Sequence, residues 1–425
     1  MKKSLFALAA LGAFAGAAQA QSSVTLYGTM DVALTYINNA GIANNGGTSP
    51  ATTTTPQSNT TPNTGNALAM TDYGIFSNVW GLKGEEDLGG GLKAVFNLES
   101  DLNALTGTIY NNSRSIGTST TATQYNQLFR RSANVGLAGS WGEVRLGQQG
   151  NPLVAASAAL LPVEGNSVNL VRTAAGYSMG DYMSNAISYQ SPNLNGLRVK
   201  AAYSASQQVD DATGGTAFAA NAFYNLGGLT FTAGYNQQYS VNTYNGTTAN
   251  TTTDASSTVV VQNTSKQGDL KGYVAGIRYK LSPAIEVGYG FGHADYNSGT
   301  SISSATTPIT YNSSSHLFGV GYQASPALLL GLNYAVTNLD SSLYNAQARY
   351  SLSKRTMLYA QVGVAKNGAG SLQSGITAGT TGTNAIGNMQ PVQVNTSVSP
   401  AAVAGYAGLP NTTQTAVGVG VVHNF

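Results

Sequence analysis

Hydrophobic and polar residues alternate along the chain from Val24 onwards. Between Val24 and Tyr36 the even-numbered positions are apolar or small, and the odd-numbered positions are mostly Thr, Tyr and Asp. A period of two residues predicts a β-strand with one apolar and one polar face. Similar segments recur up to the last residue, Phe425. The pattern therefore predicts an all-β protein, whose apolar faces pack either in a soluble sandwich core or against lipid.

The alternation predicts sixteen strands. An antiparallel barrel with both termini at one rim needs an even number of strands, and sixteen meets this requirement. The predicted strands cover Val24–Tyr36, Asn78–Glu86, Leu92–Glu99, Phe129–Leu137, Glu143–Gln149, Asn185–Gln190, Leu197–Ser204, Ala217–Leu226, Leu229–Tyr239, Lys271–Leu281, Ile285–Asp295, His316–Gln323, Leu328–Val336, Tyr344–Leu352, Thr356–Val364 and Thr415–Phe425.

Short and long connections alternate between these strands. The short turns are rich in Gly, Pro, Ser or Asn and cover Asp87–Gly91, Gly139–Gly142, Pro192–Gly196, Gly227–Gly228, Ser282–Pro283, Ala324–Pro326 and Ser353–Arg355. The long segments cover Asn38–Ser77, Asn103–Leu128, Asn151–Ser184, Ser240–Asp269, Tyr296–Ser315 and Lys366–Gln414. Short turns at one rim and long loops at the other are typical of a transmembrane β-barrel. A compact soluble sandwich rarely carries so much loop.

Composition also favours a membrane barrel. Only 8% of the residues are charged, the chain has no cysteine, and it contains 51 Gly and 24 Tyr. The lack of cysteine excludes a disulfide scaffold and a thiolate metal site. Beyond the N-terminal segment no apolar run reaches about 18 residues, so the sequence offers no transmembrane helix. Short strands remain as the means of crossing a bilayer.

The N-terminal segment predicts export. Lys2 and Lys3 precede the apolar stretch Leu5–Ala17, and Ala18-Gln19-Ala20 has the small residues of a cleavage site. We therefore expect a signal peptide over residues 1–20 and a single barrel domain over residues 21–425. Without the first two of its 19 basic residues, the chain has as many basic as acidic residues, namely 17. This balance argues against a nucleic-acid partner.

Charged and tyrosine side chains occupy opposite registers of the predicted strands. The charged register holds Asp31, Lys83, Lys93, Glu99, Arg130, Glu143, Arg145, Arg198, Lys200, Arg278, Lys280, Glu286 and Arg349. The opposite register holds Tyr203, Tyr224, Tyr235, Tyr273, Tyr279, Tyr289, Tyr322, Tyr334, Tyr344 and Tyr350. An Arg or Lys at the bilayer midplane costs roughly 2–4 kcal/mol, so the charged register is expected to face an aqueous lumen. Tyr is favoured at membrane interfaces. The exceptions Glu86, Arg131 and Lys271 lie near strand ends, and the glycines from Gly288 to Gly292 are expected on the lumen face.

Several motifs together resemble one family. They are Gly81–Ala94, the opening Val24–Gly28, Val135–Leu137 with Gly142–Gly147, Ser188–Pro192, Leu352–Thr356 and the end Val419–Phe425. They span nearly the whole chain after residue 20. In these motifs the chain resembles the trimeric general porins of Gram-negative bacteria, in their β-proteobacterial branch. The resemblance implies a sixteen-stranded outer-membrane barrel, a homotrimer and passive diffusion of small hydrophilic solutes and ions.

The resemblance also implies a pore constriction. In this family the third extracellular loop, here Asn151 to about Ser184, folds into the lumen and narrows it. Its charges should face basic residues of the wall, and the implied constriction residues are Lys83, Arg130, Arg145, Glu164, Arg172 and Asp181. Opposed charges across a lumen create a field that discriminates solutes by charge. The alternative is that Arg130 and Arg145 pair with local acids such as Glu143.

This sequence departs from the family at some positions. Val79, Gln148, Met183, Val422 and Asn424 stand where family members often carry arginine. If these positions correspond, the lumen has lost positive charge. We therefore expect near-neutral or mild ion selectivity.

Two other functions remain open from the sequence. One is an adhesin or structural barrel with a plugged lumen, which conductance would distinguish from a porin. The other is a barrel hydrolase, for which His316 with a loop serine is the arrangement to test. No cofactor is expected. The expected partners are two further copies of the chain, outer-membrane lipid including lipopolysaccharide, and the barrel-assembly machinery, for which the terminal Phe425 resembles a recognition signal.

Overall fold

The computed structural model describes residues 23–41, 64–72, 74–109, 115–116, 127–163, 180–206, 215–239, 269–297, 310–338, 340–366 and 413–425. The predicted signal peptide lies outside these residues. One short helix, α2 (Pro152–Ser157), accompanies the strands in this part of the chain. The strands are β1 (Ser23–Gly41), β2 (Thr64–Asp72), β3 (Val79–Gly89), β4 (Leu92–Asp101), β5 (Ser115–Ile116), β6 (Ser132–Gly139), β7 (Gly142–Gly150), β8 (Tyr182–Gln190), β9 (Leu197–Ser204), β10 (Ala217–Leu226), β11 (Leu229–Tyr239), β12 (Asp269–Lys280), β13 (Ile285–Asn297), β14 (Thr310–Gln323), β15 (Leu328–Thr337), β16 (Ser342–Ser351), β17 (Thr356–Lys366) and β18 (Thr413–Asn424).

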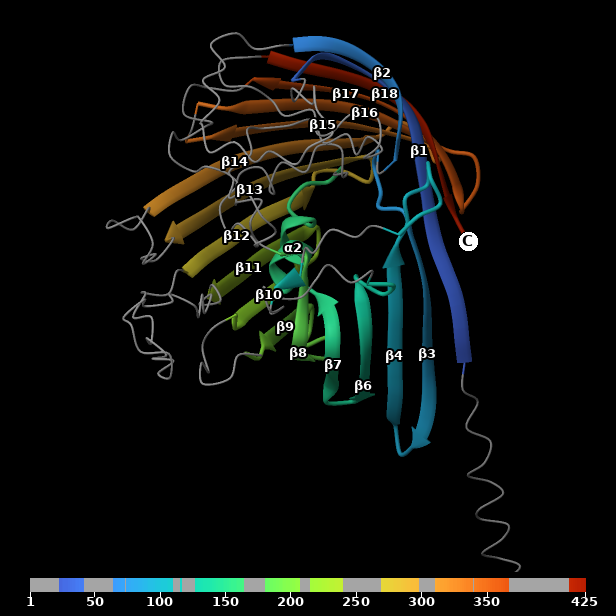
Figure 1. Cartoon of the computed structure of the whole chain (residues 1–425), viewed down its shortest axis with the longest axis vertical. Coiled ribbons are helices and arrows are strands. Elements are labelled where there is room, and N and C mark those ends of the chain that lie inside the picture. Colours follow the sequence, from blue (N-terminus) through green and yellow to red (C-terminus); the bar gives the residue numbers. More distant parts are fainter. Residues whose placement is uncertain are drawn as a thin grey trace, which may run out of the picture.

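The strands form a closed antiparallel barrel of sixteen wall strands. β2 and β3 pair with the second and the first half of β1 respectively, so they form one wall strand that is interrupted between them. The two-residue β5 pairs in parallel with β8 and is not part of the wall. Every other wall strand pairs with its neighbour in sequence, and β1 closes the barrel against β18. Figure 1 shows the curved wall and places α2 inside it.

The first and last strands of the wall meet at the rim with the short turns. The backbone N–H of Phe425 donates to the carbonyl oxygen of Gly28 at 3.1 Å, and the Gly28 N–H donates back at 3.2 Å. The Phe425 ring lies against Gly28, where a Cβ would clash with it. These contacts add Phe425 to the β1–β18 closure and confirm the prediction that both ends lie at one rim.

Most predicted strands are confirmed, but one predicted loop is wrong. β10 and β11 have the predicted bounds, and β12–β18 differ from them by a few residues. The segment Asn38–Ser77 was expected to be loop, whereas the structure extends β1 to Gly41 and places β2 within it. β6 begins at Ser132 rather than Phe129, because residues 128–131 form a turn. The shift matters for function, since Arg130 and Arg131 lie in that turn.

The outward register of the wall is apolar and aromatic, as predicted. Large side chains on it are exposed in the isolated barrel, with Leu68 at 66% and Leu332 at 62%. The exposed tyrosines include Tyr203, Tyr224, Tyr273, Tyr279, Tyr289, Tyr322, Tyr344 and Tyr350. An apolar surface of this extent is typical of a face that meets lipid. Outward charges such as Glu86, Lys271 and Lys366 lie near strand ends. No helix in the described ranges has the length and hydrophobicity needed to span a bilayer.

The inward register is less uniformly polar than the sequence predicted. Leu270, Leu317 and Leu343 face inward on β12, β14 and β16, and each is at most 1% exposed. They belong to one buried apolar cluster with Leu153, Leu160 and Leu161, which follow β7 in the chain. The prediction of an ionised inner face is therefore wrong for this part of the wall, because a segment of the chain packs against it from within.

Candidate pore constriction

Residues 151–163, which we call the inner segment, enter the barrel after β7. The Asn151 side chain caps α2 by accepting a hydrogen bond from the Leu153 N–H at 3.0 Å, and Pro152 occupies the first turn. Asn151 also holds the two ends of this loop together. Its backbone N–H donates to the Asp181 carbonyl at 2.9 Å, and its side-chain amide donates to the Gly180 carbonyl at 2.9 Å.

A row of glycines on the inner wall receives the inner segment. A Cβ at Gly234 would lie 2.7 Å from the Cβ of Ala156, and one at Gly331 would lie 2.7 Å from Cγ1 of Val163. Other glycines that face the segment in this way are Gly276, Gly288, Gly290, Gly319 and Gly321. Because they lack side chains, the segment approaches the wall at backbone distance. The lumen-face role expected for Gly288 and Gly290 is confirmed, and its physical reason is this close approach.

Hydrogen bonds fix the segment at both ends. The Asn221 side-chain amide on β10 donates to the Pro152 carbonyl at 2.8 Å. At the other end, the side-chain amides of Asn333 and Gln347 donate to the Val163 carbonyl at 2.6 and 3.3 Å. Together with the buried Leu153 and Leu160, these contacts hold the inner segment against the wall from β10 to β16.

A second stretch, residues 74–78, folds inward where the wall strand is interrupted between β2 and β3. The carboxylate of Asp31, which is fully buried, accepts hydrogen bonds from the N–H groups of Ile75 and Phe76 at 2.6 and 2.7 Å. Its other oxygen accepts from the Tyr359 hydroxyl at 2.6 Å. The Phe76 ring reaches across to β16, where the Arg349 guanidinium lies 5.4 Å from its centroid. This stretch therefore covers the inner face of β1, β17 and β18.

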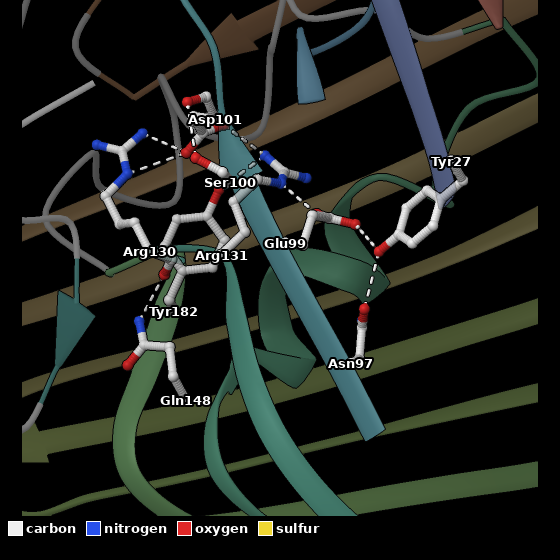
Figure 2. A network of polar contacts seen from close by, with 9 residues as sticks. All are labelled: Tyr27, Asn97, Glu99, Ser100, Asp101, Arg130, Arg131, Gln148 and Tyr182. Atoms are coloured by element: carbon white, nitrogen blue, oxygen red, sulfur yellow. Dashed lines mark hydrogen bonds and ion pairs between the residues drawn. The ribbon is translucent and has the colours of Figure 1, made fainter. Parts of the chain in front are cut away.

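A cluster of charged and polar side chains lies beside residues 74–78, on the part of the wall opposite the inner segment (Figure 2). The guanidinium of Arg131 contacts the Glu99 carboxylate, donates to Asp101 at 3.0 Å and donates to the Tyr182 hydroxyl at 2.7 Å. Arg130 donates to Asp101 from Nε at 2.9 Å. The Tyr27 hydroxyl of β1 donates toward Glu99 at 2.7 Å and Asn97 at 2.8 Å. Two arginines thus face two acids, and the charges within this cluster balance.

The predicted constriction residues that the structure describes do not form one cluster, and each contacts different partners. Arg145 donates to both oxygens of Glu143 and to the Asn134 side-chain oxygen, which is the local pairing that the sequence left open. Lys83 lies over the Tyr27 ring, with Nζ 5.0 Å from the centroid. Arg130 is buried beside Asp101, and Asp181 is buried at the base of the loop. Glu164 and Arg172 lie outside the described residues.

Three of the positions where family members often carry arginine, Gln148, Met183 and Val422, form hydrogen bonds with neutral groups or are buried. The Gln148 amide donates to the Arg130 carbonyl at 2.7 Å, and its oxygen accepts from the Ser184 hydroxyl at 2.5 Å. Met183 and Val422 are almost completely buried. A β-bulge at Gly147, with φ of 118°, shifts the strand register just before Gln148, and the next residue, Gln149, accepts a hydrogen bond from the Ser188 hydroxyl instead.

Sequence reasoning missed Asp31 and Tyr359 as a pair and Arg131 as a lumen residue. Asp31 could have been recognised from the sequence, because it is an acid in the inward register of β1. Tyr359 also lies in the inward register, whereas most tyrosines of the wall lie outward. No group of three or more His, Cys, Asp or Glu side chains that could hold a metal ion occurs in the described part of the chain.

These features define a class: a transmembrane β-barrel with an apolar outer wall and inward-folded segments in its lumen. A family model for Gram-negative porins matches residues 7–370. The chain therefore belongs to the Gram-negative porins, and its location is the outer membrane.

Individual relatives agree with this assignment. The chain is 32% identical over 220 residues to an outer membrane porin protein of Bordetella pertussis, a match that covers 50% of each chain. It is 33% identical over 213 residues to outer membrane porin protein 32 of Delftia acidovorans, covering 48% of this chain and 49% of the other. The chain thus spans about half the length of the curated relatives it matches.

Solved structures support the fold. The anion-selective porin from Comamonas acidovorans has a TM-score of 0.64 at 22% identity, and the match covers 95% of this chain and 100% of that one. The trimer form of OmpT, an outer membrane protein of Vibrio cholerae, has a TM-score of 0.56 at 14% identity, covering 95% and 99%. At these identities the likeness concerns the fold alone.

Proposed function

We propose that the barrel is an outer-membrane channel for passive diffusion of small hydrophilic solutes and ions. The observation that carries this proposal is the partial exposure of charged side chains that face the interior. The Arg145 and Glu143 side chains are 22% and 27% exposed, and those of Arg131 and Glu99 are 23% and 17% exposed. Charged groups keep such exposure only where water reaches them. Passive diffusion through this lumen needs no reacting group and no cofactor.

Liposome swelling tests the permeation proposal. Vesicles that contain the purified protein are placed in isotonic solutions of neutral sugars of increasing size. The proposal expects swelling rates that fall steadily as the sugar becomes larger. Swelling no faster than in protein-free vesicles, for every sugar, would favour a plugged adhesin or structural barrel instead.

We further propose that the inner segment and the Arg130–Arg131 cluster form the narrow part of the pore, with Lys83, Arg145, Glu164, Arg172 and Asp181 contributing charge. Ion selectivity is proposed to be weak, because several of the inward cations are paired with acids on the wall. Lys93 lies 2.8 Å from Glu85, and Arg278 lies 3.6 Å from Glu286. The structural neighbour from Comamonas acidovorans is described as anion-selective, so selectivity is the property in which this chain is expected to differ.

Substitution of Glu143 by glutamine is expected to shift the channel toward anions. The change leaves the partly exposed Arg145 without its carboxylate partner. A unit charge acts on an ion about 8 Å away in water with about 0.5 kcal/mol, which favours the anion and disfavours the cation by roughly twofold each, so the anion-to-cation permeability ratio should change roughly fivefold. Reversal potentials across a salt gradient measure this ratio. Glu86→Gln is the matched control, because Glu86 lies on the outward register of β3, and it should leave the ratio unchanged. An equal shift in both variants would argue against a lumenal effect.

Assembly as a homotrimer in contact with outer-membrane lipid is part of the proposal. The trimer form of the Vibrio cholerae structural neighbour supports it by fold analogy. Phe425 is proposed as part of the signal read by the barrel-assembly machinery, since it ends the strand that closes the barrel. Chemical cross-linking of the protein in intact outer membranes, followed by denaturing electrophoresis, is expected to give a band of three subunits.

A barrel hydrolase is the weaker alternative. His316 contacts the Tyr289 hydroxyl at 2.8 Å, and His293 lies between Ser314, 2.6 Å from Nδ1, and Asp295, 3.1 Å from Nε2. A Ser–His–Asp triad places the serine on Nε2 and the acid on Nδ1, which is the opposite arrangement. The Ser314 N–H donates to the Asn338 side chain rather than lying free for an oxyanion. Ester hydrolysis that disappears in Ser314→Ala would overturn the assignment of a non-catalytic barrel.

A further inference from the structure

Phe76 exposes an aromatic ring inside the barrel. Other large apolar side chains that face inward, such as Leu270 and Leu317, are at most 1% exposed. Phe76 lies in the stretch 74–78, which folds inward between β2 and β3, and it is 40% exposed. Because the wall separates this ring from the membrane lipid, the molecules that reach it are those that enter the lumen. Removal of apolar surface from water is favourable, so the ring is suited to contact an apolar part of such a molecule.

Contacts on two sides fix the position of the ring. The Phe76 backbone N–H donates to the buried Asp31 carboxylate at 2.7 Å. The Arg349 guanidinium of β16 lies 5.4 Å from the ring centroid. Its Nε donates in turn to the Gln347 side-chain oxygen at 2.8 Å. The ring is therefore preorganised, and little conformational freedom is lost when another group packs on it.

The ring also lies close to the end of the inner segment. The Gln347 side-chain amide donates to the Val163 carbonyl at 3.3 Å. A chain of contacts thus joins Phe76 through Arg349 and Gln347 to Val163. Both inward-folded stretches of the chain therefore contact neighbouring side chains of β16. Because the inner segment is proposed to form the narrow part of the pore, a solute in transit passes close to the Phe76 ring.

We propose that Phe76 binds solutes that carry an aromatic ring while they pass through the pore. This inference rests on the proposed permeation function and names a class of solute for it. Two stacked aromatic rings gain free energy beyond the burial of their area, so the site distinguishes an aromatic ring from a saturated ring of similar size. The contact is small, and passage requires binding that is weak enough for the solute to leave again.

The experiment compares the entry of phenyl β-glucoside and cyclohexyl β-glucoside into the vesicles of the swelling assay. The two solutes share the same sugar and carry rings of similar size, but only one ring is aromatic. Rates are corrected for vesicles without protein. The unmodified protein is expected to admit the phenyl compound roughly threefold faster, because stacking lowers its free energy in the narrow part of the pore. Equal rates for the two glucosides would overturn the proposal.

Phe76→Leu removes the ring and keeps an apolar side chain. The two glucosides are then expected to enter at similar rates, whereas entry of a small neutral sugar should stay near that of the unmodified protein. Phe318→Leu is the matched control, because Phe318 on β14 is 46% exposed but faces the membrane. It should keep the preference of the unmodified protein. A preference that persists in Phe76→Leu, or that falls equally in both variants, would overturn the assignment to Phe76.

Arg349 acts as a positioning residue for the ring, and the same assay tests this role. Arg349→Gln removes the cation beside the ring and is expected to reduce the preference for the phenyl compound. Arg349→Lys keeps a cation for the ring and should retain most of the preference. A general loss of folded channels lowers both rates together, so the ratio of the two rates reports positioning and not stability. An undiminished preference in Arg349→Gln would overturn this role.

The assay also separates this inference from the permeation proposal. Entry of neutral sugars without discrimination between the two glucosides overturns the role of Phe76 alone. Absence of entry for every solute overturns the permeation proposal, and the inference fails with it.

Discussion

Substitution of Asp31 by alanine is expected to destabilise the folded barrel by several kcal/mol. The buried carboxylate accepts hydrogen bonds from the Ile75 and Phe76 N–H groups and from the Tyr359 hydroxyl. Hydrogen bonds to charged groups contribute about 1.5–3 kcal/mol each, and their loss leaves buried donors without partners. Thermal unfolding in detergent, followed by circular dichroism at a fixed scan rate, should show a markedly lower transition temperature.

Tyr359→Phe measures how much the Tyr359 hydrogen bond to Asp31 contributes to the stability of the barrel. It removes one of the three hydrogen bonds and keeps the ring, so its transition temperature should lie between those of the unmodified protein and Asp31→Ala. Thr71→Ala is a control for loss of a buried polar group nearby, since among the described residues the Thr71 hydroxyl bonds only the Thr35 hydroxyl, at 2.8 Å. An Asp31→Ala transition no lower than that of Thr71→Ala would contradict the role of Asp31 as the anchor of residues 74–78.

The double substitution Gly290→Val and Gly331→Val is expected to narrow the pore. A Cβ at Gly290 would lie 3.0 Å from the Cβ and a Cδ of Leu160, and one at Gly331 would lie 2.8 Å from the Cβ of Val163. Overfilling this contact pushes the inner segment away from the wall and toward the lumen centre, at a cost of about 1–3 kcal/mol. Single-channel conductance should fall roughly twofold, because it depends on the open cross-section.

Gly418→Val is the control for this effect. Gly418 also faces inward, and the three atoms nearest to a Cβ there, of which Oγ1 of Thr35 at 3.0 Å is the first, all lie outside the inner segment. Its conductance should stay close to that of the unmodified protein. Unchanged conductance in the double variant, with the fold intact by circular dichroism, would show that residues 151–163 do not limit the pore.

The barrel wall could be predicted from the sequence because each wall residue has one of two environments. Ala217–Leu226 and Leu229–Tyr239 have their predicted bounds, because large outward side chains such as Phe218, Tyr224 and Phe231 alternate with the inward positions of both strands. β2 could not be recognised so easily. Its nine residues show only Leu68 and Met70 as clear outward positions, and they follow a long Thr- and Asn-rich stretch.

The contacts inside the lumen were predictable only where they are local. The Arg145–Glu143 pair joins residues two apart on one strand, so both side chains must lie on the same face. By contrast, Asp31 meets Tyr359 from 328 residues away. The inward Leu270 and Leu317 pack against Leu160 only because the chain after β7 turns into the barrel. Such contacts depend on the closed fold, which no local pattern encodes.

Water and ions are proposed to pass through the barrel of this porin. Single-channel recording of the purified protein in a planar lipid bilayer measures this passage. We expect stepwise conductance increases in groups of three, ohmic at low voltage, with weak discrimination between small cations and anions. Correctly inserted, folded protein that produces no conductance steps would contradict it.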